Sequence, residues 1–415
     1  MRRAIFLGMT LTLSALAFAC SGGGARSQPT TGITPAPGVL SGLSSQPAPD
    51  EGTFVIDLSA DRWIQVLPTL GEYLVDVSPD GEAILYRVYP TPNAPELFAV
   101  DVDGSNRRKI GDGFVGAAFS PGGEKLAVWG QGRPLTLMDW PDGELVDTEV
   151  PTGVRTVLWS RQNDLAAETD DPSAARSELY LVRRDGTTER AARSSSLGAL
   201  SWAPDGSRLA FVDANAVRTV EPGGQAEALA TLSAYPYNAN GPLSWSPDGG
   251  LLAVRAGRQA TADPLYGTSD IVVIGATTGE TRFTLISAGA AAGAWSPTRP
   301  VLLFDGNACL GGDWQLMLVD GDGTNLRPLA SQHAFSYLAG TDWSPDGRFV
   351  VKMPAENGVV TTVDIATGET RGIFLGTGLL SGLRWVTRDR LVVSTTGGGD
   401  ACAQDLGEKT RVVFP

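Results

Sequence analysis

A short phrase recurs along this chain at nearly regular intervals. Close copies of Trp-Ser-Pro-Asp-Gly start at Val77, Trp202, Trp245 and Trp343, and degraded copies start at Phe119, Trp159, Trp295 and Trp385. The intervals between successive starts are 42, 40, 43, 43, 50, 48 and 42 residues. A self-similar period in the forties is typical of a β-propeller, in which each repeat supplies one blade.

Each close copy contains a turn with a clear physical cause. A type I turn prefers Ser at its first position, Pro at the second, where the ring already sets φ, and Gly at the fourth. Ser-Pro-Asp-Gly meets all three preferences. Short apolar runs flank the phrase, for example residues 243–245 and 251–254. This pattern predicts a hairpin that forms the two inner strands of a blade.

A second hairpin is predicted in each repeat. Asp103-Gly104 separates residues 96–102 from residues 107–110, and Asp322-Gly323 separates residues 315–319 from residues 326–329. Asp-Gly between alternating strands is a strong hairpin signal. Two hairpins give a four-stranded antiparallel sheet, which has to stack on its neighbours around an axis to bury both faces. We therefore predict an all-β β-propeller with eight blades, seven being the next alternative, and expect the recurrent Trp to pack between blades.

The repeat resembles a known family. The run at residues 202–211, of the form Trp-Ser-Pro-Asp-Gly-x-x-Leu-Ala-Phe, together with the Asp-x-Asp-Gly turns, is similar to the WD-like repeat of TolB-type β-propellers. The resemblance covers roughly residues 54–414. The chain departs from TolB in leaving no room for a separate N-terminal α/β domain. The resemblance implies a protein or peptide partner at the cell envelope, docked over the mouth of the propeller channel.

Residues 1–20 have the form of an export signal. Arg2 and Arg3 precede an apolar run at residues 4–19, which is too short to span a membrane as a helix of its own. The run ends at Cys20, in a context that resembles a bacterial lipoprotein cleavage box. We predict that Cys20 is acylated and anchors the chain to a membrane, the alternative being cleavage and release. The predicted location is the bacterial cell envelope, outside the cytoplasm.

The segment at residues 21–52 is predicted to be a disordered tether, because its Gly, Pro and Ser content cannot bury enough apolar area to fold. The propeller domain is predicted at residues 53–415. It opens with two strand-like runs, residues 54–58 and 63–67, that have no preceding Trp-Ser-Pro-Asp-Gly. Either this pair adds to the last blade, as in rings closed by strands from both termini, or it indicates a different number of blades.

Acylation of Cys20 leaves Cys309 and Cys402 in an oxidising compartment. Both are predicted on one rim of the ring but in repeats six and eight. A disulfide requires Cα atoms within about 7 Å. The sequence leaves a disulfide and two unpaired thiols as equal alternatives.

The chain is acidic and offers no catalytic motif. Its formal charge of −14 becomes about −16 once Arg2 and Arg3 leave with the signal, which argues against a nucleic-acid partner. No Gly-x-Ser-x-Gly elbow is present, and His333 is the sole histidine. The Gly-x-Gly-x-x-Gly match at residues 111–116 is predicted to lie between two strands, unlike a dinucleotide fingerprint. The Asp-x-Asp-Gly segments are interpreted as turns and not as calcium loops.

Sequence therefore predicts a monomeric binding scaffold without cofactor, metal or catalytic residues. Its binding surface is expected on the rim opposite the Ser-Pro-Asp-Gly turns, where long loops carry aromatic and arginine residues of the kind that dominate interfaces. The candidates are Tyr235, Tyr237, Asn238, Arg255, Arg258, Tyr266, Trp314, His333, Phe335 and Tyr337. The plainer interpretation is that these aromatics only cover the blade ends. Further alternatives are a propeller glycan lyase or hydrolase with acids and arginines around the channel, and a purely structural envelope protein.

Overall fold

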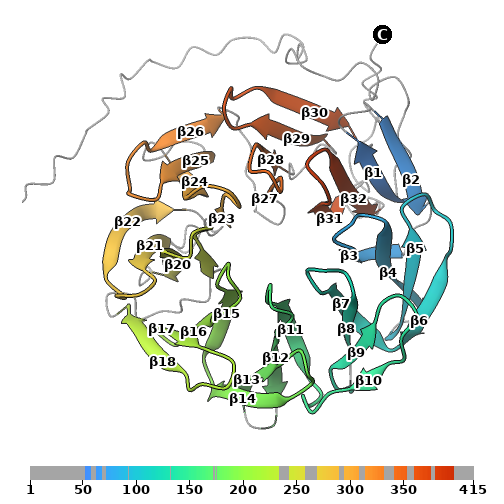
Figure 1. The fold of residues 1–415 in the computed structure, drawn as a ribbon. Helices are drawn as coiled ribbons and strands as arrows, with labels where there is room; N and C mark the ends of the chain where they lie inside the picture. The colour runs from blue at the N-terminus through green and yellow to red at the C-terminus, as the bar shows by residue number, and fades with distance from the viewer. Residues whose placement is uncertain are drawn as a thin grey trace, which may run out of the picture. The chain divides into compact units, whose positions relative to one another are not determined.

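The computed structural model describes residues 52–57, 62–67, 72–91, 93–130, 132–171, 173, 175–232, 243–257, 269–288, 294–307, 314–330, 341–352, 359–374 and 379–396. They belong to one compact unit, Ala36–Pro415. Their strands form eight four-stranded antiparallel blades arranged as a β-propeller (Figure 1). The prediction of eight blades is confirmed, and the alternative of seven is wrong. These ranges contain no helix, and hence none that could cross a membrane.

The strands of each blade are called A to D from the centre outward. In chain order, blades 1 to 4 are β3 (Glu72–Val77), β4 (Ala83–Thr91), β5 (Ala94–Asp101) and β6 (Arg108–Asp112); β7 (Phe114–Phe119), β8 (Lys125–Gly130), β9 (Thr136–Asp139) and β10 (Val146–Asp147); β11 (Val154–Trp159), β12 (Leu165–Asp171), β13 (Arg176–Val182) and β14 (Thr188–Ser194); β15 (Leu197–Trp202), β16 (Leu209–Asp213), β17 (Ala216–Val220) and β18 (Glu227–Thr231).

Blades 5 to 8 continue the same order. They are β19 (Leu243–Trp245), β20 (Leu251–Gly257), β21 (Ser269–Gly275) and β22 (Thr281–Ala288); β23 (Ala294–Trp295), β24 (Val301–Asn307), β25 (Trp314–Asp320) and β26 (Arg327–Ala330); β27 (Thr341–Trp343), β28 (Phe349–Lys352), β29 (Val359–Asp364) and β30 (Thr370–Phe374); β31 (Leu379–Trp385), β32 (Arg390–Thr396), β1 (Gly52–Asp57) and β2 (Arg62–Leu67). One backbone pair, Ala288 with Gly306, joins blades 5 and 6 into a single sheet.

Blade 8 closes the ring with strands from both ends of the described chain. Its order is β2-β1-β32-β31, and β1 pairs with β32 in antiparallel register, with Val55 opposite Val392. The unassigned strand pair at the start of the propeller therefore completes the last blade. The chain after residue 396 lies outside the described residues. Closure of this kind removes a sheet edge that could otherwise pair with another chain.

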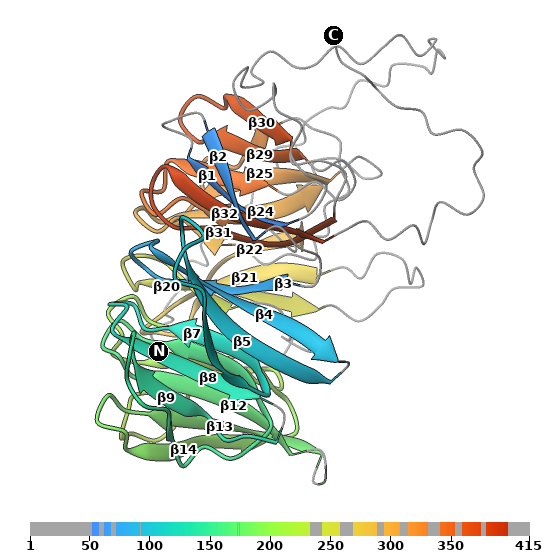
Figure 2. The ribbon, with the colours of Figure 1, turned by 90° about the vertical axis from the view of Figure 1, so that its right-hand side faces the viewer.

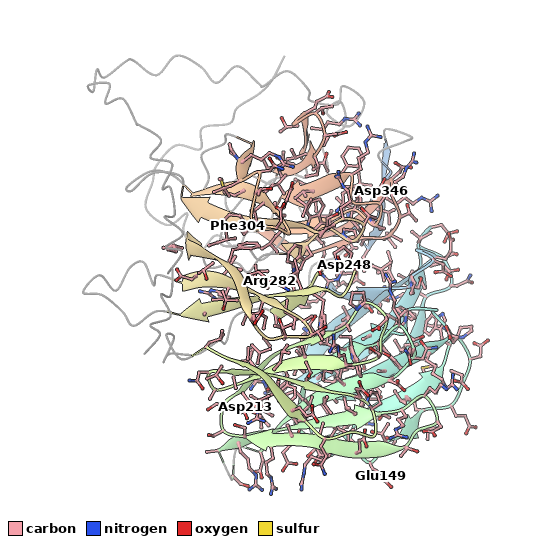
Figure 3. The ribbon with its side chains drawn as sticks, turned by 60° about the vertical axis from the view of Figure 1, so that its left-hand side comes forward. Glu149, Asp213, Asp248, Arg282, Phe304 and Asp346 are labelled. Atoms are coloured by element: carbon pink, nitrogen blue, oxygen red, sulfur yellow. The ribbon has the colours of Figure 1, made fainter. Side chains whose placement is uncertain are left out.

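The antiparallel blades give the ring two unlike faces. The strand ends that lead into the A–B and C–D connections lie on one side, which we call the turn face, and the strand ends that lead into the B–C and D–A connections lie on the other, the loop face. Seen edge on, the strands run across the thickness of the ring between these faces (Figure 2). Asp248 and Asp346, from two Ser-Pro-Asp-Gly turns, lie toward the right of Figure 3, and Asp213, at the end of a B strand, lies toward its left.

The Ser-Pro-Asp-Gly turn forms as its chemistry predicts. In blade 5 the N–H of Gly249 donates to the Ser246 carbonyl at 2.9 Å. The Ser246 hydroxyl donates to the Asp248 carboxylate at 2.6 Å, which also accepts the N–H of Gly250 at 3.0 Å. Gly249 has a φ of +71°, a conformation in which a Cβ is strained. The phrase is thus a self-contained turn that sets the A–B hairpin.

The apolar core lies between neighbouring blades. One buried cluster, for example, joins Ile271 and Val273 of blade 5 to Trp295, Leu302 and Phe304 of blade 6. The recurrent Trp packs at these junctions, as predicted, and it also makes a hydrogen bond that the sequence did not reveal. Its indole Nε1 donates to a carbonyl on the A strand of the preceding blade. The pairs are Trp159–Ala118 at 2.9 Å, Trp202–Leu158 at 3.0 Å, Trp245–Ser201 at 2.9 Å, Trp295–Ser244 at 3.1 Å and Trp343–Ala294 at 3.0 Å.

Blade 2 has Phe119 in place of this Trp and uses a different contact. The carboxylate of Asp76 in blade 1 accepts the N–H of Phe119 at 2.9 Å. Burial raises the pKa of Asp76, while its backbone hydrogen bonds and the charge of Arg384 act in the opposite direction. A carboxylate thus links two A strands where the indole is missing.

Candidate functional site

Most of the rim residues predicted from sequence lie outside the described residues. These are Tyr235, Tyr237, Asn238, Arg258, Tyr266, His333, Phe335 and Tyr337, and the same holds for Cys20, Cys309 and Cys402. Arg255 lies near the end of β20 and Trp314 begins β25, so the topology puts both positions toward the loop face. Burial lowers the pKa of Arg255.

Blade 1 presents two exposed tyrosines at the same face. Tyr73 and Tyr89 contact edge to face, with ring centroids 5.8 Å apart, and both rings are exposed. The guanidinium of Arg87 lies 5.1 Å from the centre of the Tyr89 ring, and its Nη1 donates to the Val115 carbonyl of blade 2. We call Tyr73, Arg87 and Tyr89 the tyrosine cluster. Its arginine is anchored while its aromatic surface stays open to solvent.

The β4–β5 hairpin carries part of this cluster beyond the inner strand. The last pair between β3 and β4 is Glu72 with Val88, whereas β4 and β5 remain paired as far as Thr91 with Ala94. Tyr89 therefore lies on a part of the hairpin that the A strand does not cover. Figure 2 shows the β4–β5 hairpin extending toward the loop-face side of the ring.

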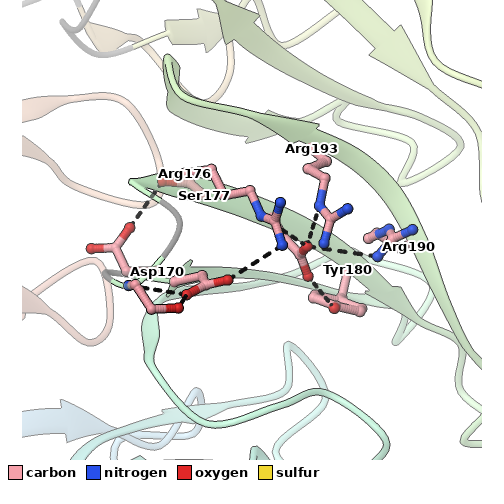
Figure 4. Close-up of polar contacts among 9 residues, drawn as sticks. Asp170, Arg176, Ser177, Tyr180, Arg190 and Arg193 are labelled. Carbon is pink, nitrogen blue, oxygen red and sulfur yellow. Dashed lines mark hydrogen bonds and ion pairs between the residues drawn. The ribbon is translucent and has the colours of Figure 1, made fainter.

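Blade 3 carries a charged network at its loop-face end (Figure 4). Glu178 lies at its centre: Arg193 Nε donates to its Oε1 at 2.5 Å, and the Tyr180 hydroxyl donates to its Oε2 at 2.5 Å. Arg190 Nη1 and Arg176 Nε lie 3.6 and 3.8 Å from the same Oε1. We call Arg176, Arg190 and Arg193 the arginine cluster.

A β-bulge puts two of these arginines on one side of the blade. Glu178 is opposite Arg193 in the register of β13 and β14, but the pairing shifts so that Tyr180 is opposite Arg190 and not Ala191. Without the shift Arg190 would be opposite Leu181 and would point to the other face, because side chains alternate along a strand. The extra residue therefore gathers Arg190 and Arg193 around one carboxylate.

This side of blade 3 faces blade 2, whose outer strands are too short to cover it. Tyr180 packs with an apolar cluster that includes Leu135 and Val150 of blade 2. However, β9 has 4 residues and β10 has 2, against 7 in each of β13 and β14. The side chains of Arg190 and Arg193 consequently remain 49% and 42% exposed, while that of Glu178 is 10% exposed.

The electrostatics of the network follow from these contacts. The hydrogen bond from Tyr180 lowers the pKa of Glu178, and the bond and charge of Arg193 and the charge of Arg190 lower it further, against a smaller effect of burial. Burial raises the pKa of Tyr180, and the neighbouring Glu178 raises it too. Glu178 is thus an anion at neutral pH that holds the guanidinium groups in place.

A second group of charges adjoins the cluster. Arg155 donates to both carboxylate oxygens of Asp170, at 2.9 and 3.0 Å, and the Arg176 guanidinium lies 3.4 Å from Asp171. Burial raises the pKa of Glu168, and its Oε1 has no hydrogen-bond partner among the described residues. Ionisation of Glu168 in the folded protein therefore costs free energy.

The described residues of the turn face line two open hollows. One of about 800 Å³ lies at blades 5 and 6, and one of about 470 Å³ lies at blades 1 and 2. Both are lined by an Asp-x-Asp-Gly turn, in which Asn325 bonds Asp320 at 2.7 Å and Asn106 bonds Asp101 at 2.6 Å. Both segments form turns, since the N–H of Gly104 donates to the Asp101 carbonyl and the N–H of Gly323 donates to the Asp320 carbonyl, each at 2.8 Å. No group of three or more acidic, Cys or His residues in the described ranges is arranged to hold a metal.

Comparison with known proteins supports the fold and leaves the function open. No protein-family model matches the chain, and no curated protein is similar to it in sequence. Solved structures with the same fold include Sqt1 from Chaetomium thermophilum, at 15% identity and a TM-score of 0.55 over 80% of this chain and 97% of that one. The C-terminal WD40 domain of Sif2 aligns at 12% identity and a TM-score of 0.54, over 79% of this chain and 97% of that one. The dihydro-heme d1 dehydrogenase NirN aligns at 16% identity and a TM-score of 0.50, over 82% of this chain and 77% of that one.

These likenesses define the class of the protein. It is a β-propeller with WD40-like blades. At such identities the neighbours show the fold alone, and their names range from a WD40 domain to a dehydrogenase. The particular function has to be argued from the surface of this chain.

Proposed function

We propose that this chain is a lipid-anchored extracytoplasmic β-propeller that binds a protein or peptide partner with its loop face and carries out no chemical turnover. The tyrosine cluster is the observation that carries the proposal. Tyr, Trp and Arg dominate the energetics of protein interfaces, because they offer large contact areas with a polar group at the tip. In blade 1 an exposed tyrosine pair and an anchored Arg87 present this combination on the hairpin that projects from the ring.

The location and partner class rest on the sequence. The signal-like residues 1–20 end at Cys20 in a lipoprotein-like context, and residues 21–52 have the composition of a tether. A flexible tether of this length spans on the order of 30 Å, which suffices to hold a propeller off a membrane. The TolB-type resemblance of the repeats supports an envelope protein or peptide as the partner.

Affinity capture from envelope extract tests this function. The Tyr73→Ala/Tyr89→Ala variant is compared with the unaltered protein and with Leu326→Ala, which removes an exposed apolar side chain near the C–D turn of blade 6. Loss of a hot-spot pair weakens binding by about tenfold or more. We expect a captured partner to lose at least this much affinity for the tyrosine variant and to bind Leu326→Ala normally.

Two outcomes contradict the proposal. One is a captured partner that binds the tyrosine variant as tightly as the unaltered protein. The other is a change of mass in the bound material on incubation, which supports the alternative of a propeller lyase or hydrolase.

A further inference from the structure

We infer that the arginine cluster of blade 3 is a docking site for an acidic peptide segment of the partner. This inference deepens the proposed function and rests on it. It follows from the number of donors, their fixed geometry and their exposure.

The cluster has more hydrogen-bond donors than its own carboxylates can accept. Each guanidinium carries five N–H donors, about fifteen in all, whereas a carboxylate accepts about four hydrogen bonds. Glu178 and Asp171 are the carboxylates in contact with the cluster, and Glu178 also accepts from Tyr180. Asp171 in turn accepts from the hydroxyl of Ser173. Three guanidinium groups contact two carboxylates, while the adjoining Asp170 is already paired with Arg155. The N–H donors of Arg176 include the buried Nε, so the donors open to a ligand are those of the half-exposed Arg190 and Arg193.

The guanidinium groups are held before any ligand arrives. Arg193 is fixed by its bond to Glu178, which is itself fixed by Tyr180, and Arg176 is held between Glu178 and Asp171. Pre-ordered side chains lose less conformational freedom on binding than mobile surface arginines do. A site of this kind favours a ligand whose oxygens accept hydrogen bonds from the remaining guanidinium N–H groups.

The carboxylate is the ligand chemistry that the cluster already displays. Glu178 shows that these guanidinium groups converge on a single carboxylate oxygen, at 2.5 to 3.8 Å. β14 is also the outermost strand of its blade, so a peptide can lie beside Arg190 and Arg193 without displacing a neighbouring strand. An acidic segment, with several carboxylates spaced along an extended chain, matches the arginines that line this strand.

The arginine cluster lies at the same face of the ring as the tyrosine cluster. Arg176 begins β13 at the loop face, and Arg193 is next to the last residue of β14, which ends at the same face. Tyr89 lies near the loop-face end of β4. A partner on the loop face therefore meets aromatic surface over blade 1 and cationic surface over blade 3, in a protein whose formal charge is −14.

Fluorescence anisotropy with a labelled hexaglutamate peptide tests the inference, with labelled hexaglutamine as the neutral probe. We expect hexaglutamate to bind more tightly than hexaglutamine, and its affinity to fall as salt is raised. Arg190→Gln/Arg193→Gln should weaken hexaglutamate binding about tenfold, because charge-assisted bonds to two guanidinium groups are lost. Arg190→Gln alone, which removes the more distant of the two, provides a variant that keeps the Arg193–Glu178 bond and should weaken binding measurably.

The matched control is Arg218→Gln/Arg327→Gln. Each of these arginines is similarly exposed and pairs with a carboxylate, Asp213 or Asp320, and the variant loses the same formal charge. It should change hexaglutamate affinity by less than about twofold. Equal losses in the two double variants, or equal binding of both peptides by the unaltered protein, would overturn the inference.

Inorganic phosphate distinguishes a carboxylate site from a general anion site. We expect it to compete with hexaglutamate only at concentrations where chloride does so as well; specific competition contradicts the assignment to an acidic peptide. The tyrosine variant separates the two proposals. Normal binding of hexaglutamate by the tyrosine variant supports the arginine site. If the same variant also captures the envelope partner at full affinity, the proposed function fails while the arginine site stands.

Discussion

The indole Nε1 of Trp245 donates to the carbonyl of Ser201, 2.9 Å away on the A strand of the preceding blade. The same bond recurs at five described junctions, each time to the residue just before the equivalent aromatic position of the blade before. One residue type therefore both fills the space between blades and ties their inner strands together. The ring that carries the loop face depends on these junctions.

Trp245→Phe should separate the two roles of this residue. Phe keeps most of the apolar contact but leaves the Ser201 carbonyl without its indole donor, and the loss of a buried hydrogen bond costs about 1–3 kcal/mol. Trp245→Ala removes the ring as well and should cost about 3–5 kcal/mol. Urea unfolding followed by fluorescence measures the loss of stability in each variant. A Phe variant as stable as the unaltered protein would show that the hydrogen bond contributes nothing.

Gly249→Ala should destabilise the protein through its backbone alone. A Cβ at Gly249 would have only the Pro204 side chain near it, at 3.8 Å, but the φ of +71° is unfavourable for alanine by about 1–2 kcal/mol. Gly250→Ala is the adjacent control, since a Cβ there makes ordinary contact with Asp248 at 3.4 Å. Thermal denaturation should show a lower midpoint for Gly249→Ala than for Gly250→Ala.

Glu168→Gln should stabilise the protein at neutral pH. Burial raises the pKa of Glu168 above its ordinary value of 4.5, so the folded state favours the protonated carboxyl. The contribution of Glu168 to the free energy of unfolding is therefore present at low pH and is lost as pH rises through the raised pKa. Glutamine stays neutral and can still accept from Thr156. The melting midpoint should exceed that of the unaltered protein at neutral pH and approach it below pH 4.5; a lower midpoint at neutral pH contradicts this account.

Glu178→Gln should have the opposite pH dependence. Tyr180, Arg193 and Arg190 lower the pKa of Glu178 below 4.5, so its stabilising contribution is present at neutral pH and is lost as pH falls through the lowered pKa. The variant should melt at a lower temperature at neutral pH and match the unaltered protein in strong acid. A constant difference across the pH range would show that the charge of Glu178 is not what stabilises the network.

Cys20→Ser should release the protein from the membrane. If Cys20 carries the lipid, the unaltered protein partitions with membranes and incorporates labelled fatty acid, and the serine variant does neither. Cys309→Ser serves as the control for loss of a cysteine. Fractionation that finds both variants in the membrane contradicts the predicted anchor.

The sequence predicted the ring better than it predicted the site. Ser-Pro-Asp-Gly is a local turn, with its bonds made between Ser246 and Leu251, so its sequence alone specifies its structure. Ring closure was ambiguous because the pairing of Val55 with Val392 joins residues from opposite ends of the described chain, and no local pattern encodes it.

The arginine cluster was missed for a similar reason. Regular alternation puts Arg190 and Arg193 on opposite faces, and only the bulge opposite Leu179 and Tyr180 brings them together. The one available signal was the density of arginines at residues 176–193 in an acidic chain. Tyr73 and Tyr89 lie outside the repeated phrase, and their proximity depends on the length of the β4–β5 hairpin.

Hydrogen exchange of the protein with and without its captured partner tests the central claim most directly, because it maps the bound face without altering any residue. Binding at the loop face predicts slower exchange in the β4–β5 hairpin and in β13 and β14, with the Ser-Pro-Asp-Gly turns unchanged. Protection confined to those turns, or to the hollows of the turn face, would contradict it.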